Sequence, residues 1–120
     1  MSAEPRSRAA RRRDTEYQLT HDIDVWVASA SADGAPYLVP LSFDWDGETL
    51  LVATPTDSPT GRNLAATRTV RLGLGHTRDV SNALATPHRW FRISPHRIQA
   101  WREVNELPDR ELMRDGRWLV

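Results

Sequence analysis

Hydroxyl, amide and guanidinium side chains gather between residues 54 and 63. Ser58-Pro59 has the residue types of a helix N-cap followed by proline at the first helical position. Such a helix start presents backbone N–H groups and the positive end of the helix dipole, both of which favour an anion, and arginine adds a charge-assisted fork. The pattern predicts a phosphate site, and the alternative is a capped helix whose arginine is merely solvated. The candidate donors are Thr54, Thr56, Ser58, Thr60, Arg62 and Asn63.

Other site chemistries find little support in the residue types. The chain has no Cys, which excludes disulfides, thiolate zinc sites and cysteine nucleophiles. Its four His lack metal-ligand spacing, and neither a nucleophile elbow nor a dinucleotide fingerprint occurs. The pair Asp44/Asp46 lies on a predicted turn, where Asp is expected for backbone reasons. The sequence therefore indicates no metal and no identifiable catalytic side chain.

The elements that must position the phosphate site are mostly strands. Alternating apolar residues, with turn residues at Asp33-Gly34 and Asp46-Gly47, predict an antiparallel meander. Pro40 cannot donate to a strand ladder, so it marks an edge, a bulge or a place where backbone faces a ligand. We expect a helix at 59–67 with Leu64 facing inward, and one helical turn at 109–114 closed by Asp115-Gly116. Strands are predicted at 24–30, 36–43, 49–54, 69–76, 89–93 and 97–101.

The five Trp are many for a chain of 120 residues. Trp26 and Trp90 lie in strand patterns and are predicted to be core residues. For Trp101 and Trp118 two interpretations stay open, a place beside a bound ligand or packing in the core or at a dimer contact.

Charge is segregated along the chain although the formal net charge is zero. Residues 14–57 carry nine carboxylates and no Arg, whereas 58–102 carry eight Arg and one Asp. Residues 1–13 hold five Arg and predict a mobile arm or the start of a surface helix. Such an arm is solvated, or it folds back on the acidic block. Nucleic-acid binding is disfavoured because no aromatics interleave the arginines.

The length predicts one domain, at 21–120, preceded by a basic arm or short helix at 1–20. No apolar run approaches the ~20 residues that span a bilayer. The polar residues after Arg11-Arg12-Arg13 exclude a twin-arginine export signal, so we expect a cytoplasmic protein without membrane contact.

Five segments in order resemble the pyridoxamine 5′-phosphate oxidase-like split-barrel flavoproteins, in particular actinobacterial-type members. Ala32 to Phe43 and Trp45-Asp46-Gly47 resemble the opening hairpins of that family, and Ala53-Thr54-Pro55 with Ser58 to Leu64 resembles its phosphate-binding strand end and helix. Further matches are Arg71 to Gly75, Arg97 to Trp101 and Met113 to Trp118.

The resemblance implies a mainly β, Greek-key split β-barrel with short helices, usually a homodimer that binds FMN between subunits. Some relatives take a deazaflavin instead, and the reactions are two-electron transfers on small molecules. On this chain, the phosphate would lie at residues 54–63 and the backbone of Pro40, Leu41 and Ser42 would face the flavin ring.

Two departures from the family pattern weaken that expectation. Many members place Arg or Lys at the positions of Ser58 and Thr60, which leaves Arg62 as the main cation. A strand and a crossover helix that the family usually has are replaced by the short bridge Ser81 to His88. Three alternatives stay open: the barrel is incomplete, a partner subunit completes it, or the protein has lost its cofactor and only dimerises or sequesters a ligand. Whether the chain is an enzyme is left undecided.

Overall fold

The computed structural model describes residues 4–75, 87–102 and 104–120 of the 120-residue chain. Residues 76–86, and with them most of the short 81–88 bridge, lie outside the described residues. The elements are α1 (Arg8–His21), β1 (Asp24–Ala30), β2 (Pro36–Trp45), β3 (Leu50–Pro55), α2 (Pro59–Thr67), β4 (Arg71–Gly73), β5 (His88–Ile93), β6 (Ile98–Gln99), η2 (Val104–Glu106), β7 (Glu111–Arg114) and β8 (Arg117–Trp118).

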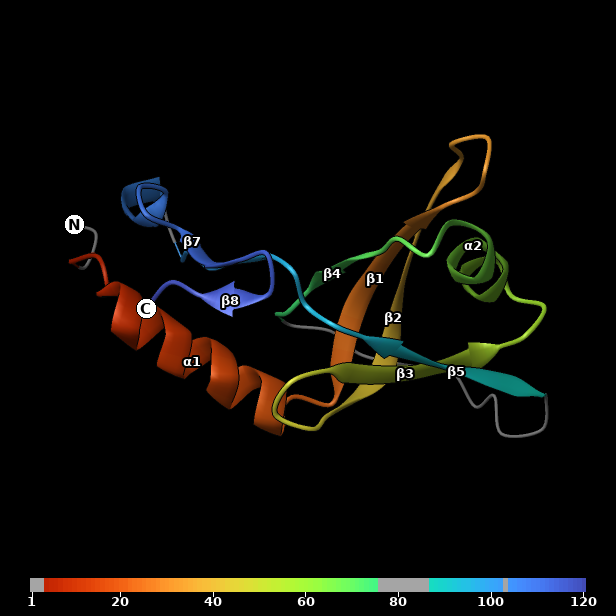
Figure 1. Cartoon of the computed structure of the whole chain (residues 1–120), viewed down its shortest axis with the longest axis horizontal. Helices are drawn as coiled ribbons and strands as arrows, with labels where there is room; N and C mark the ends of the chain where they lie inside the picture. Colours follow the sequence, from red (N-terminus) through yellow and green to blue (C-terminus); the bar gives the residue numbers. More distant parts are fainter. Residues whose placement is uncertain (1–3, 76–86, 103) are drawn as a thin grey trace.

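Five strands form one antiparallel sheet in the order β4-β1-β2-β3-β5 (Figure 1). The predicted meander β1-β2-β3 is confirmed. Its turns use Gly34 at φ 92° and Gly47 at φ 98°, a backbone region that disfavours residues with a Cβ. Within the described residues, β4 and β5 are separate edges of this sheet, so it does not close on itself there.

One face of this sheet carries the core. Val25, Val27 and Val52 are fully buried because alternate residues of neighbouring strands point to the same side. The predicted alternation from Val70 to Leu74 is confirmed, although β4 covers only Arg71–Gly73. The side chains packed against the buried valines are Leu41, Phe43, Val70, Leu72, Leu74, Phe91 and Ile93.

The prediction that Trp26 and Trp90 are core residues is wrong. Both point to the opposite face of the sheet and are 37% and 65% exposed. Trp26 lies across from Pro40 and Gly73, and Trp90 lies across from Ala53. Each tryptophan has apolar sequence neighbours on the opposite face, Val25 and Val27 beside Trp26 and Phe91 beside Trp90, so the pattern alone could not say which face is covered.

A second, smaller unit consists of α1 and the three-stranded sheet β6-β7-β8, which we call the C-terminal lobe (Figure 1). The expected helical turn at 109–114 is wrong, because β7 occupies Glu111–Arg114. Asp115 and Gly116 adopt φ 52° and 78° between the paired residues Arg114 and Arg117. Asp-Gly therefore forms a two-residue hairpin turn, for which both positive φ values are required, and does not end a helix.

The later part of the basic segment, residues 8–13, forms the start of α1, so the segment is not a solvated arm. The Ser7 hydroxyl accepts a hydrogen bond from the Ala10 N–H at 3.1 Å and caps the helix. Arg6 pairs with Glu106 and Asp14, and Arg11 is 5% exposed. The positive charge thus meets mainly C-terminal groups and Asp14 of the same helix, and not the acidic hairpins that the fold-back alternative names.

The molecule is elongated, with extents of 46 × 28 × 28 Å. The lobe and α2 lie toward opposite ends of the long axis (Figure 1). Neither helix described between Arg8 and Thr67 is long and apolar enough to cross a membrane.

Candidate functional site

Strands β2 and β3 separate where the candidate site lies. β3 pairs with β2 only through Leu50–Val52, opposite Phe43–Trp45. The earlier part of β2, from Pro36 to Ser42, pairs with β1, and the later part of β3 pairs with β5. Helix α2 begins shortly after β3 and lies on the open side of this divergence (Figure 1).

The predicted helix at 59–67 is confirmed, and its cap is Ser58. The Ser58 Oγ accepts from the Gly61 N–H at 3.0 Å, donates to the Pro55 carbonyl at 2.8 Å and lies 2.9 Å from Thr54 Oγ1. A hydroxyl has one proton and two lone pairs, so these three bonds use the Ser58 side chain completely. Ser58 and the buried Thr54 therefore hold the turn between β3 and α2.

Gly61 is a residue that sequence reasoning missed. A Cβ at this position would lie 2.7 Å from the Pro55 carbonyl oxygen and 3.0 Å from that of Thr56. Only glycine allows the helix start to approach the strand end so closely. The signal was present in the sequence, because glycine inside a helix costs about 1 kcal/mol relative to alanine and needs a local reason.

Two of the predicted donors keep hydrogen-bonding capacity. Thr60 is 1% exposed, and its Oγ1 has no hydrogen-bond partner. Arg62 is exposed, and one of its nitrogens, Nη1, donates to the Asp57 carbonyl at 2.6 Å. The buried Asn63 instead donates to the Ser29 Oγ at 3.1 Å and ties α2 to β1.

The candidates on β2 do not join this cluster on one face. Leu41 packs against the buried core, whereas Pro40 and Ser42 share the opposite face, where Ser42 donates to Asp24 at 3.0 Å. The remaining candidate, Thr56, is half-buried, and its N–H donates to the Pro87 carbonyl at 3.0 Å. Residues 54–63 thus form one cluster at the helix start, and residues 40–42 lie along the strand beside it.

Trp101 and Trp118 belong to the part of the chain that follows β5. The Arg12 guanidinium lies 4.2 Å from the ring centroid of Trp118, and that of Arg110 lies 5.9 Å from Trp101. Trp118 therefore packs against α1, whereas Trp101 remains 50% exposed.

Acid–base groups are not concentrated at the helix start. Hydrogen bonds from the Thr49 and Glu48 N–H groups and the Thr49 hydroxyl lower the pKa of Asp46 to about 2. This carboxylate, which also pairs with Arg92, holds the β2–β3 hairpin, as the turn prediction implies. Across residues 4–75, 87–102 and 104–120, no three His, Asp or Glu side chains are arranged to hold a metal ion.

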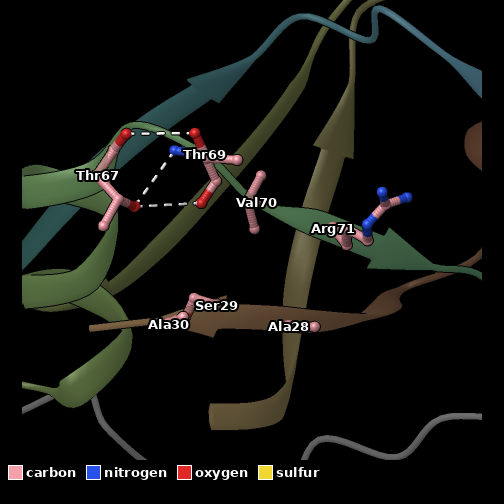
Figure 2. Close-up of a pocket in the computed structure, with 7 residues that line it drawn as sticks. All are labelled: Ala28, Ser29, Ala30, Thr67, Thr69, Val70 and Arg71. Carbon is pink, nitrogen blue, oxygen red and sulfur yellow. Dashed lines mark hydrogen bonds between the residues drawn. The ribbon is translucent and has the colours of Figure 1, made fainter. Parts of the chain in front are cut away.

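An open pocket of about 280 Å³ lies at the other end of α2 (Figure 2). It forms where the chain before β4 departs from β1, between Ser29-Ala30 and Thr67 to Val70. Hydrogen bonds between Thr67 and Thr69 brace one wall, and Arg71 supplies its charged group. The lining offers no paired acid and base, so the helix start remains the stronger candidate site.

The comparison with protein-family models agrees with the sequence resemblance. The family model for pyridoxamine 5′-phosphate oxidase matches residues 16–113. A solved structure described as an F420 reductase is 30% identical, with a TM-score of 0.45 over 48% of this chain and 45% of that one. The match thus spans less than half the length of that protein. No protein with curated annotation matches the sequence.

Proposed function

The chain belongs to the pyridoxamine 5′-phosphate oxidase family, and from this premise we propose that it binds a flavin-type cofactor and transfers two electrons to or from a small molecule. FMN is the first candidate and a deazaflavin the second. The observation that carries the proposal is the unpartnered Thr60 hydroxyl at the start of α2, two residues before the exposed Arg62.

The residues present fit a phosphate group in part. The buried Thr60 Oγ1 lacks the hydrogen bond that a phosphate oxygen can accept, and an unmade bond of this kind costs about 1–3 kcal/mol. The helix dipole and Arg62 supply positive charge. Because Thr60 is 1% exposed, a ligand oxygen reaches it only after neighbouring groups shift.

The side-chain contacts support different roles for the sequence candidates. In this proposal Thr60 and Arg62 contact the phosphate, helped by Thr56, and Arg62 releases the Asp57 carbonyl to do so. Thr54, Ser58 and Asn63 act indirectly, since their side chains already hold α2 to β3 and β1. The cofactor supplies the redox chemistry, and the chain binds and orients it along the backbone of Pro40, Leu41 and Ser42.

We further propose that the protein is a homodimer whose subunits meet through the outer face of the five-stranded sheet. That face carries Trp26, Leu38 and Trp90, which are 37%, 61% and 65% exposed. Apolar surface of this kind on a sheet marks an interaction site. A second copy is the occupant that the family resemblance suggests.

One observation favours a second candidate function. Ser58, the centre of the predicted phosphate site, has no free hydrogen-bonding capacity. A chain that has lost its cofactor and retains the split barrel only to dimerise or to sequester a ligand would keep this capped turn.

The test is a titration of the purified protein with FMN and with a deazaflavin, followed by fluorescence. We expect saturable binding of one of them at micromolar levels. Arg62→Ala should weaken it by roughly 10- to 100-fold, the range for a hydrogen bond to a charged group. Arg13→Ala, which removes an exposed arginine from α1, is the control and should bind like the parent. Absence of saturable binding to both cofactors would favour the second function, and an unchanged affinity in Arg62→Ala would remove the site assignment.

A further inference from the structure

The C-terminal lobe has a small buried interior of its own. Arg11, Thr15 and Leu19 are spaced four residues apart on α1 and are all buried, at 5%, 6% and 5% exposure. Helix α1 contacts β7, where Leu112 and Met113 are buried at 0% and 6%. An arginine and a threonine in this interior leave little apolar surface to hold the lobe together, so polar contacts must contribute.

Glu106 is the centre of those polar contacts. It is 3% exposed, and its carboxylate accepts hydrogen bonds from the Arg6 backbone N–H at 3.0 Å, Arg6 Nε at 2.9 Å and Arg6 Nη2 at 2.8 Å. A fourth bond comes from the Arg102 N–H at 2.8 Å. One carboxylate thus joins the segment before α1 to the segment that follows β6.

Arg11 makes a second set of bonds between the same two segments. Its Nη1 donates to the Glu106 carbonyl at 3.0 Å and to the Asp109 carbonyl at 3.3 Å. Its Nε donates to the Arg6 carbonyl at 3.1 Å. The buried guanidinium therefore donates hydrogen bonds to carbonyls of the loop between β6 and β7. Without that loop, its Nη1 group would lose these acceptors.

The lobe is joined to the rest of the molecule by few elements. Among the described elements, α1 makes the main packing contact between the two units, against β2. No strand of β6-β7-β8 packs closely along a strand of the five-stranded sheet, and the lobe projects from one end of it (Figure 1). The polar bonds at Glu106 and Arg11 therefore run within the lobe.

We propose that the C-terminal lobe opens as one cooperative unit while the five-stranded sheet stays folded. In the closed lobe, Glu106 holds α1 to β6-β7-β8. Removing one partner of a buried ion pair leaves the other charge without compensation, so the pair is made or broken as a whole. Proteins open in contiguous cooperative units of this size.

Amide hydrogen exchange of the full chain, read by mass spectrometry, tests the proposal. In Glu106→Gln we expect peptides from α1 and from residues 104–118 to exchange faster together, by about tenfold or more, as for loss of a charged hydrogen bond. Peptides from β1, β2 and β3 should keep their parental rates. Arg6→Gln should have the same pattern, because it removes the other partner of the pair.

Glu111→Gln is the matched control. Glu111 pairs with Arg97 and Arg114 in the same lobe, but those arginine side chains are 58% and 66% exposed. It should leave exchange in the lobe close to parental rates. Faster exchange confined to residues around Glu106, or spread equally over both sheets in Glu106→Gln and Arg6→Gln, would overturn the proposal.

Discussion

At the scale of single residues, the start of α2 separates hydroxyls that hold the fold from one that does not. Ser58 and Thr54 are bonded to each other and to the turn, while the Thr60 Oγ1 is buried without a partner. Buried polar groups are normally hydrogen-bonded, and an exception calls for an explanation such as a bound ligand. Removal of the Thr60 hydroxyl should therefore stabilise the ligand-free protein and weaken binding of the proposed ligand.

Thr60→Val should raise the free energy of unfolding of the ligand-free protein by about 1 kcal/mol, since it replaces an unsatisfied hydroxyl with a methyl group. Thr67→Val on the same helix is the control. It removes a bond to the Asn63 carbonyl at 2.9 Å and should lower the free energy of unfolding. Urea denaturation measures both, and equal losses in the two variants would contradict an unpartnered Thr60. The cofactor proposal adds that Thr60→Val binds FMN more weakly than the parent.

At the scale of elements, charged side chains hold the lobe and one hairpin in place. The Arg6 side chain, together with the Arg6 and Arg102 N–H groups, lowers the pKa of Glu106 from 4.5 to about 2. A depressed folded-state pKa means that the carboxylate stabilises the fold above its unfolded value and loses that contribution as the pH falls toward the folded one. The relevant interval for Glu106 is thus pH 4.5 down to about 2.

Acid should therefore open the lobe. As the pH is lowered from about 5 to 2, we expect hydrogen-exchange protection of α1 and β7 to fall, in line with protonation of Glu106. Glu106→Gln should remove most of that pH dependence from the lobe. It should leave the β2–β3 hairpin, where Asp46 titrates with its own pKa of about 2, responding to acid as in the parent. A parental acid response of the lobe in Glu106→Gln would assign the effect to other carboxylates.

At the scale of the whole molecule, the outer face of the five-stranded sheet exposes large apolar side chains in the single chain. Trp26 and Trp90 occupy strand positions in which the sequence predicts burial, yet the chain itself does not cover them. A homodimer that buries this face would account for both residues.

Trp90→Glu should weaken the proposed dimer, because it places a charge within the proposed apolar contact. Trp101→Glu is the control, since Trp101 is 50% exposed but lies between β6 and β7 of the lobe, outside the strands of the five-stranded sheet. Sedimentation velocity over a concentration series, with circular dichroism to show that both variants fold, measures the effect. A monomeric parent, or equal dissociation in the two variants, would speak against this face as the interface.

Local chemistry explains which features could be predicted from the sequence. Alternation and turn residues predicted β1, β2 and β3, and the Ser58-Pro59 pair predicted the start of α2, because hairpin turns and helix caps depend on residues close in sequence. The family resemblance rested on these segments and on three later ones, and it agrees with the match over residues 16–113. At Asp115-Gly116 the local signal was also present, but it was interpreted as the end of a helix.

Contacts between distant segments decided the rest. The sequence could not say that Arg6 meets Glu106, since a charge finds its partner only after the chain ends are brought together. Nor could it say which face of a strand is covered where apolar residues stand at adjacent positions, because that depends on what packs there, as Trp26 and Trp90 show. The same reason applies at the candidate site: the sequence determined that hydroxyls and an arginine meet at a helix start, and only the tertiary structure decided that Ser58 is fully bonded while Thr60 is not.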